Sequence, residues 1–424
     1  MVERQARFDE VAYLRHAVQL CQSHSYLDAA GRPTDFWPIG FPLALAAAVC
    51  ISGGHPAAGV SLQITIGLFT CLLVSMLGER IFGRAPGRVA GLVMAFYPTH
   101  VFYSTLLLAE PLATLMLVAA AACLLRSLRG GWIAAIAGGL FLGYAILTRP
   151  VLMLLPGIIP FWYIHNGQAV RRAARHSSLI ACGVLIVLGP WMIRNYRLFG
   201  GWAEISSTGG YNFLLGNSPG ALGGYLRVPG INPQMRSDGA EDWSHGYRSG
   251  WETIRRQPAA AVARTIQKIS YFLALETDGV LWNLKGLRSP VSIGATLALL
   301  ALANLAYLAL TCICLLALLI PAREHAFTSL LWLLAGYLLL MAAVFVGDPR
   351  YHFPLVPFAA LVVSSTLLND APNMLAAVRG GQPAARRQLA AWSALMVLFG
   401  LLLVGNLWLK RLEVQRFGVA GERT

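Results

Sequence analysis

The stretch that decides the fold class is VSIGATLALLALANLAYLALTCICLLALLI, residues 291–320, which contains no Asp, Glu, Lys or Arg. A helix needs about 20 mostly apolar residues to cross the hydrocarbon core of a bilayer. A soluble domain has no use for so long an uncharged run, so the stretch predicts a membrane-spanning helix. The whole chain agrees, with 57% hydrophobic and 12% charged residues.

Further apolar segments of this kind occur on both sides of that stretch. We expect spans near residues 59–79, 88–105, 108–126, 131–148, 151–165, 177–193, 291–320, 326–346, 353–369 and 389–409. The predicted fold class is therefore an all-α polytopic membrane protein. It has about ten transmembrane helices, further interfacial helices and one long extracytoplasmic loop.

The net charge of +14 suggests a nucleic-acid partner at first sight. Its distribution favours another explanation, because the arginines gather at 80–88, 126–129, 171–175 and 379–387, in connections that fall on one side of the predicted spans. Short loops rich in Lys and Arg are typical of the cytoplasmic face. We therefore expect a multi-pass protein of the plasma (inner) membrane, with no nucleic-acid partner.

This sidedness divides the chain into four parts. Residues 1–58 form an extracytoplasmic loop with juxtamembrane helices, and 59–194 form a transmembrane bundle. Residues 195–290 form a second extracytoplasmic loop, with an amphipathic helix expected at 258–275, and 291–424 form a C-terminal bundle. The apolar segment 36–53 is short and flanked by prolines, so we expect it to lie in the interface rather than to cross.

The N-terminal region and the cysteines carry two more expectations. Residues 1–35 are polar, lack a signal-peptide pattern and yet must reach the outer face, so we expect a preceding span that this sequence does not contain. Of the seven cysteines only Cys21 lies in a polar stretch. Neither a disulfide framework nor a metal-ligand spacing is visible.

Acids and arginines on the predicted outer face are the candidate functional residues. The adjacent carboxylates of Asp9 and Glu10 suit general-base chemistry, although two acids in a first helical turn are also ordinary. Arg149, Arg194 and Arg350 can hold a phosphate with two parallel hydrogen bonds, although arginines at span ends also snorkel to the interface. Glu110 precedes Pro111, and it can equally cap its helix or orient the acceptor or Asp9.

The order of these motifs resembles that of a known superfamily. The series runs through Asp9-Glu10 with Tyr13, Arg32-Pro33-Thr34, Trp37 to Pro42, Leu108-Ala109-Glu110, Thr148-Arg149-Pro150, Arg194-Asn195, Gly216-Asn217 and Gly347 to Tyr351. It is similar to that of the polytopic glycosyltransferases of the C superfamily, which use polyprenyl-phosphate sugars. Protein O-mannosyltransferases and the lipid A aminoarabinose transferase belong to this group. The first transmembrane helix that usually precedes the acid is absent here.

The resemblance implies roles for particular residues. An acid of the first outer loop takes part in catalysis and a second acid lies in the next outer loop, which gives Asp9, Glu10 and Glu110 as catalytic candidates. The candidates for substrate binding are Arg149, Arg194, Arg350, Tyr13, Tyr351 and Asn217.

The implied activity is transfer of a sugar from a polyprenyl-phosphate donor to a lipid, glycan or protein acceptor on the extracytoplasmic face. No Gly-rich nucleotide loop follows a strand, which favours a lipid-linked donor. We expect no cofactor and, without an Asp-x-Asp motif, no obligatory metal.

Other functions stay open: a transporter or flippase, an enzyme like an O-antigen ligase or polymerase, and a structural membrane subunit. Transporters commonly show internal repeats and ionisable residues at mid-membrane. The predicted spans have neither feature.

Overall fold

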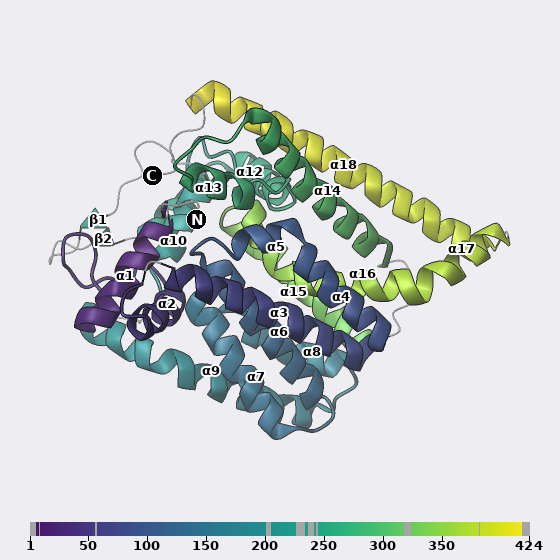
Figure 1. The fold of residues 1–424 in the computed structure, drawn as a ribbon, viewed down its shortest axis with the longest axis horizontal. Coiled ribbons are helices and arrows are strands. Elements are labelled where there is room, and N and C mark those ends of the chain that lie inside the picture. The colour runs from purple at the N-terminus through teal and green to yellow at the C-terminus, as the bar shows by residue number, and fades with distance from the viewer. Residues whose placement is uncertain are drawn as a thin grey trace.

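The computed structural model describes residues 6–7, 9–55, 57–200, 205–225, 234–235, 241–242, 245–317, 324–380 and 382–417. Residues 318–320, the end of the stretch quoted first, lie outside these ranges. The described chain is almost entirely helical (Figure 1), which confirms the predicted all-α class.

The helices of the N-terminal half are α1 (Asp9–Ser23), α2 (Gly40–Ile51), α3 (Ala58–Phe82), α4 (Arg84–Phe96), α5 (Pro98–Tyr103), α6 (Ala109–Ser127), α7 (Trp132–Thr148), η1 (Pro150–Leu152), α8 (Leu155–His165) and α9 (Val170–Phe199). The long loop contains α10 (Thr208–Asn217), the antiparallel pair β1 (Gln234–Met235) and β2 (Glu241–Asp242), α11 (His245–Arg256), α12 (Pro258–Phe272) and α13 (Asp278–Gly286). The C-terminal part contains α14 (Ile293–Ala317), α15 (His325–Val344), η2 (Pro349–Leu355), α16 (Val356–Ser365), η3 (Thr366–Asp370), α17 (Ala371–Arg379) and α18 (Pro383–Phe417).

Among the described residues, 7 helices are long and apolar enough to cross a membrane: α3, α6, α9, α14, α15, the run Pro349–Asp370 and α18. The expected spans at 88–105, 131–148 and 151–165 correspond to shorter helices. The first of them is broken, because Tyr97 precedes a proline and adopts an extended conformation (φ −66°, ψ 114°), which ends α4 and lets α5 begin at Pro98. The chain is thus polytopic, and the count of about ten spans stays a prediction.

Two predicted interfacial helices are present. α2 has 12 residues, about 18 Å at 1.5 Å per residue, which is too short to cross a core of about 30 Å. The helix expected at 258–275 is confirmed as α12. The position of either helix relative to a bilayer stays a prediction.

Small residues allow the bundle to pack closely at the contact of α7 with α9. A Cβ added at Gly139 would lie 2.2 Å from the carbonyl oxygen of Ile180, and one added at Gly183 would lie 2.5 Å from that of Ile136. Close backbone approach through small residues is typical of helices that pack inside a membrane. These glycines fix the spacing of α7, whose C-terminal end leads into the site described below.

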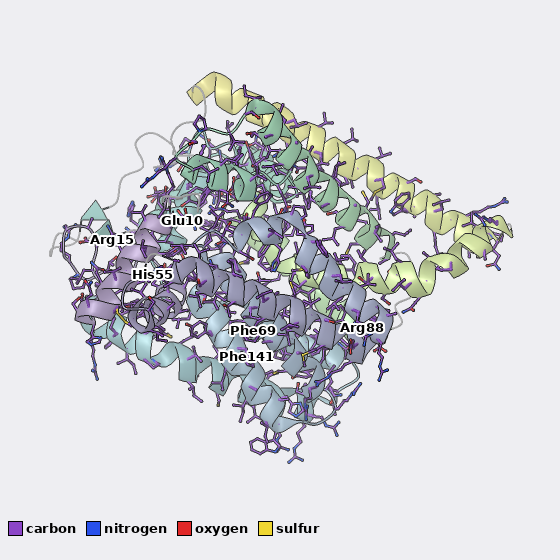
Figure 2. All side chains as sticks on the ribbon, viewed as in Figure 1. Glu10, Arg15, His55, Phe69, Arg88 and Phe141 are labelled. Carbon is purple, nitrogen blue, oxygen red and sulfur yellow. A yellow bond between two sulfur atoms is a disulfide. The ribbon has the colours of Figure 1, made fainter. Side chains whose placement is uncertain are left out.

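The molecule has two polar ends separated by an apolar middle. Figure 2 shows Glu10, Arg15 and His55 at one end and Arg88 at the other, with Phe69 and Phe141 between them. These two phenylalanines are 57% and 37% exposed, which suits side chains that contact lipid. In Figure 1, α1, α2 and α10 gather at the end of Glu10, whereas α17 lies at the opposite end.

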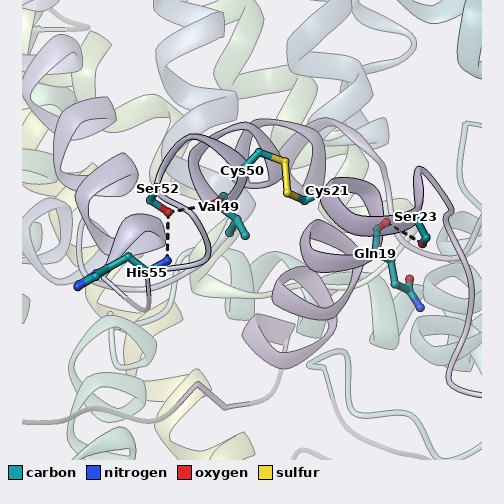
Figure 3. Close-up of a disulfide and its surroundings, with 7 residues drawn as sticks. All are labelled: Gln19, Cys21, Ser23, Val49, Cys50, Ser52 and His55. Atoms are coloured by element: carbon teal, nitrogen blue, oxygen red, sulfur yellow. Dashed lines mark hydrogen bonds between the residues drawn. A yellow bond between two sulfur atoms is a disulfide. The ribbon is translucent and has the colours of Figure 1, made fainter.

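One prediction about cysteines is wrong. Cys21 at the end of α1 and Cys50 at the end of α2 form a disulfide, with Cα atoms 5.6 Å apart (Figure 3). The sequence did not indicate the pair because Cys50 lies in an apolar stretch and a cysteine there is ordinary. The two helices pack side by side, which brings together cysteines that are 29 residues apart. The disulfide ties the helix that carries Asp9 to the rest of the molecule.

Candidate active site

The first acid of the site stands at the start of α1. Asp9 is the first residue of the helix, and its Oδ2 lies 3.1 Å from Nη1 of Arg350. One turn later Tyr13 is buried, with its ring packed edge-on against Trp37 (5.1 Å) and Phe41 (5.2 Å). This aromatic packing orients α1, so Asp9 is held at the edge of the bundle.

The second acid is paired with the first of the predicted arginines. Glu110 lies in the first turn of α6 and is 2% exposed, and its Oε1 accepts a hydrogen bond of 2.8 Å from Nη1 of Arg149. Arg149 follows α7 in an extended conformation, and its guanidinium lies 5.1 Å from the ring centre of Tyr351. The pair therefore joins α6, the end of α7 and η2.

Arg350 stands at the centre of the site. Its Nε lies 3.3 Å from Asp348 and 3.4 Å from Asp278, and its Nη1 reaches Asp9 at 3.1 Å and Glu110 at 3.9 Å. Asp348 also caps η2, because its Oδ1 accepts the backbone N–H of Arg350 at 2.9 Å. One guanidinium thus organises carboxylates from α1, α6 and α13 and from the residue that precedes η2.

The four carboxylates differ in access. The side chain of Asp9 is 31% exposed, whereas those of Glu110, Asp278 and Asp348 are almost fully buried. Desolvation by the surrounding protein raises the pKa of Asp9, and Glu110 raises it further, whereas Arg350 opposes the shift. Asp9 is therefore the acid of this cluster that a substrate can reach, and its basicity is increased.

The cluster contains two arginines and four acids, so its net charge is negative when every acid is ionised. Among the described residues no group of three or more His, Cys, Asp or Glu could share a metal ion. The carboxylates lie around a guanidinium instead of converging on one another. The expectation that no metal is obligatory stays a prediction.

Five of the predicted site residues meet here: Asp9, Glu110, Arg149, Arg350 and Tyr351. Tyr13 borders them, and burial raises its pKa well above the ordinary value. Its hydroxyl is therefore not expected to titrate.

Glu10, although adjacent to Asp9, points elsewhere. It is fully buried, and its carboxylate accepts the backbone N–H groups of Leu107 (2.9 Å) and Arg7 (3.0 Å). This arrangement fastens α1 to the segment before α6, so the observed contacts of Glu10 are structural.

Arg194 and Asn217 also lie apart from the cluster. Arg194 donates to the backbone oxygens of Thr34 and Tyr26, and its guanidinium lies 4.5 Å from the ring centre of Trp191. Asn217 accepts a hydrogen bond of 2.8 Å from Nζ of Lys268 and donates to the carbonyl of Val344. Both residues fix loops to the bundle, and their predicted contact with substrate stays a prediction.

Sequence reasoning missed Asp278 and Trp282 as members of the site. Asp278 is the first residue of α13, and Trp282, one turn later, places its ring centre 5.0 Å from the Arg350 guanidinium. An acid at a helix start, four residues before a tryptophan in an outer loop, was the available signal. It was too ordinary to single out without knowing that α13 packs beside η2.

Comparisons with known proteins give a likeness of fold. No family model and no curated protein matches the chain. Among solved structures, ArnT from Cupriavidus metallidurans bound to undecaprenyl phosphate is 16% identical, with 90% of this chain and 77% of ArnT covered and a TM-score of 0.41. The Archaeoglobus fulgidus oligosaccharyltransferase in complex with Zn and sulfate is 14% identical, with 92% and 49% covered and a TM-score of 0.49.

A further match is archaeal AglB from Archaeoglobus fulgidus in complex with an inhibitory peptide and a dolichol-phosphate, at 12% identity, 93% and 50% coverage and a TM-score of 0.45. The chain spans about half the length of this archaeal protein.

Proposed function

We propose that the protein is an integral membrane glycosyltransferase that moves a sugar from a polyprenyl-phosphate donor to a lipid, glycan or protein acceptor. The observation that carries the proposal is the arrangement around Arg350. One partly exposed carboxylate, Asp9, stands at the edge of a network of buried acids and arginines at the polar end of a membrane bundle. Such a network holds an accessible base in a fixed position.

Asp9 is the proposed general base. A lipid-phosphate sugar is already activated, so the enzyme must remove a proton from the acceptor hydroxyl or amine as that atom attacks the anomeric carbon. The C–O bond to the phosphate breaks, and the polyprenyl phosphate leaves with the bonding electron pair. Arg350 keeps the Asp9 carboxylate in place, and the Glu110–Arg149 pair borders the same space.

The disulfide supports an extracytoplasmic location for this end of the molecule. Structural disulfides form and persist in oxidising compartments and are rare in the cytosol. Cys21–Cys50 joins the helix of Asp9 to α2. Arg88, from one of the arginine clusters expected in the cytoplasm, lies at the opposite end of the molecule (Figure 2). Both observations favour a site that opens to the outside.

The test supplies radiolabelled polyprenyl-phosphate sugars to membranes that contain the protein, and measures transfer into lipid, glycan and protein fractions. Wild-type membranes should transfer label. Asp9→Asn should lower the rate by about 100-fold to 10,000-fold, because it keeps the shape but removes the base. Glu252→Gln, which changes an exposed acid of α11, is the matched control and should keep the wild-type rate. Normal transfer by Asp9→Asn would refute the assignment of the base.

A further inference from the structure

The arginines of the site are already paired with carboxylates. The Arg350 guanidinium contacts Asp9, Asp278 and Asp348, and Arg149 donates to Glu110. A phosphate at Arg350 would also face the surrounding carboxylates, which repel it. Another arginine, with unused donors, is a better candidate for the phosphate of the donor.

Arg264 on α12 has this property. Its side chain is 5% exposed, and among the described residues its Nε and Nη2 have no hydrogen-bond partner. Buried guanidinium groups are normally paired, because a desolvated N–H without an acceptor is costly, and more so when the group is charged. Two such nitrogen atoms on one side chain indicate that an acceptor belongs there.

The orientation of α12 makes this position unusual. Arg264 and Lys268, one turn apart, point into the protein, whereas Val262 and Ile266 point outward and are 62% and 57% exposed. A helix at a water-exposed surface shows the opposite pattern, with apolar side chains inside and cations outside. The outer face of α12 therefore suits acyl or isoprenoid chains, and its inner face presents the Arg264 guanidinium and the Lys268 amine.

Lys268 does not supply the missing counter-charge. Its Nζ donates to Oδ1 of Asn217 at 2.8 Å and to the carbonyls of Val344 (3.1 Å) and Ala343 (3.3 Å). Burial and, to a smaller extent, the nearby Arg264 lower the pKa of Lys268 to about 7. The described residues form no ion pair with either cation, so the inner face of α12 is positive and lacks a neutralising anion.

This face lies next to the candidate active site. Gly347 packs so closely on α12 that an added Cβ would be 2.0 Å from the backbone oxygen of Lys268. Gly347 directly precedes Asp348, and Arg350 follows two residues later. Arg264 is one helical turn from Lys268, about 6 Å along the axis. Arg264 therefore lies about one turn along α12 from the contact with the segment that carries Asp348 and Arg350.

We propose that Arg264 binds the phosphate of a lipid-linked donor, with Lys268 adding positive charge and with Val262 and Ile266 lying against the isoprenoid chain. The proposal rests on the function proposed above. It assigns the phosphate to a residue outside the acid–arginine network, and it gives the outward apolar face of α12 a ligand.

The test measures binding of undecaprenyl phosphate to the full-length protein in nanodiscs, without any sugar transfer. Arg264→Gln should weaken binding by about 10-fold to 150-fold, the equivalent of losing one hydrogen bond to a charged group. Arg264→Lys, which keeps the charge but not the planar fork, should fall between Gln and the wild type. Arg256→Gln, on the exposed surface of α11, is the matched control and should bind as the wild type does.

Thermal unfolding separates binding from a structural role. Without ligand, Arg264→Gln should melt at the wild-type temperature or above it, because it removes a buried charge that has no partner. With undecaprenyl phosphate the wild type should gain stability and Arg264→Gln should gain much less. A lower melting temperature of ligand-free Arg264→Gln, or unchanged affinity, would overturn the proposal.

The source of the phosphate is tested with inorganic phosphate as competitor. We expect it to displace undecaprenyl phosphate only at far higher concentration, because it cannot use Val262 and Ile266. If inorganic phosphate and undecaprenyl phosphate bind with equal affinity, Arg264 binds phosphate but the isoprenoid chain is not recognised, which would overturn the assignment to a lipid-linked donor. A wild-type protein that does not bind undecaprenyl phosphate would contradict the proposed function itself. Wild-type binding with unchanged binding by Arg264→Gln would contradict only this assignment.

Discussion

Replacing Gly347 by Ala should disable the site without touching any of its charged groups. An added Cβ would lie 2.0 Å from the backbone oxygen of Lys268 and 2.8 Å from Cβ of Tyr271. Ordinary contact begins at 3.4 Å, so one backbone must retreat by about 1.4 Å, and overpacking of this kind costs about 1–3 kcal/mol. The hydrogen bond of 2.9 Å from Gly347 N–H to the carbonyl of Gly223 is strained by the same movement.

The effect on activity follows from the position of Gly347 beside Asp348 and Arg350. A displacement of about 1 Å in a catalytic group can cost about 100-fold in rate, so we expect at least this loss in the radiolabelled transfer assay. The melting temperature should fall by a few degrees. Gly336→Ala on α15 is the matched control, because no atom lies within 4 Å of its added Cβ. Turnover and melting temperature equal to those of the wild type in Gly347→Ala would refute this reasoning.

Three further predictions concern α1, the disulfide and the topology. Glu10→Gln should lower the melting temperature, because one of the N–H groups of Leu107 and Arg7 loses its acceptor. Unlike Asp9→Asn, it should keep the wild-type turnover per folded molecule. A loss of turnover at unchanged stability would instead make Glu10 catalytic. Replacing both Cys21 and Cys50 by Ala should lower the free energy of unfolding by about 3–4 kcal/mol, from the entropy of a loop closed across 29 residues; free thiols at both positions in protein from intact cells would disprove the pair. An impermeant thiol reagent should label a cysteine introduced at Gln257 but not one at Ala85 in intact cells, and the reverse pattern would invert the proposed orientation.

The membrane class and most helices were predictable because a helix that crosses the bilayer core requires a long run of apolar residues. Tyr97 and Pro98 show where this reasoning weakens: the apolar segment 88–105 was expected as one span, and it folds as two short helices because a proline breaks it. Hydropathy averages over such a break, whereas backbone sterics do not.

The site was predictable in part. Asp9 and Glu110 were predicted from the resemblance to a known superfamily, and Arg149 and Arg350 from their place at the outer ends of spans; the structure brings all four together. The sequence does not indicate which of Asp9 and Glu10 faces Arg350. Neighbouring residues on a helix point about 100° apart, so the packing of α1 decides this. Arg264 was not singled out within the amphipathic helix expected at 258–275, because its burial depends on segments far away in the sequence.

The contact between Asp9 and Arg350 joins residues that are 341 positions apart. During synthesis Asp9 reaches the membrane long before its guanidinium partner exists, whereas Glu110 meets Arg149 after only 39 further residues. The acidic cluster is therefore completed among the last steps of insertion, when the chain after α15 arrives. A nascent protein halted before that point carries a solvated, unpaired Asp9 on an otherwise assembled first bundle. The Asp9–Arg350 ion pair therefore distinguishes the finished protein from such an intermediate.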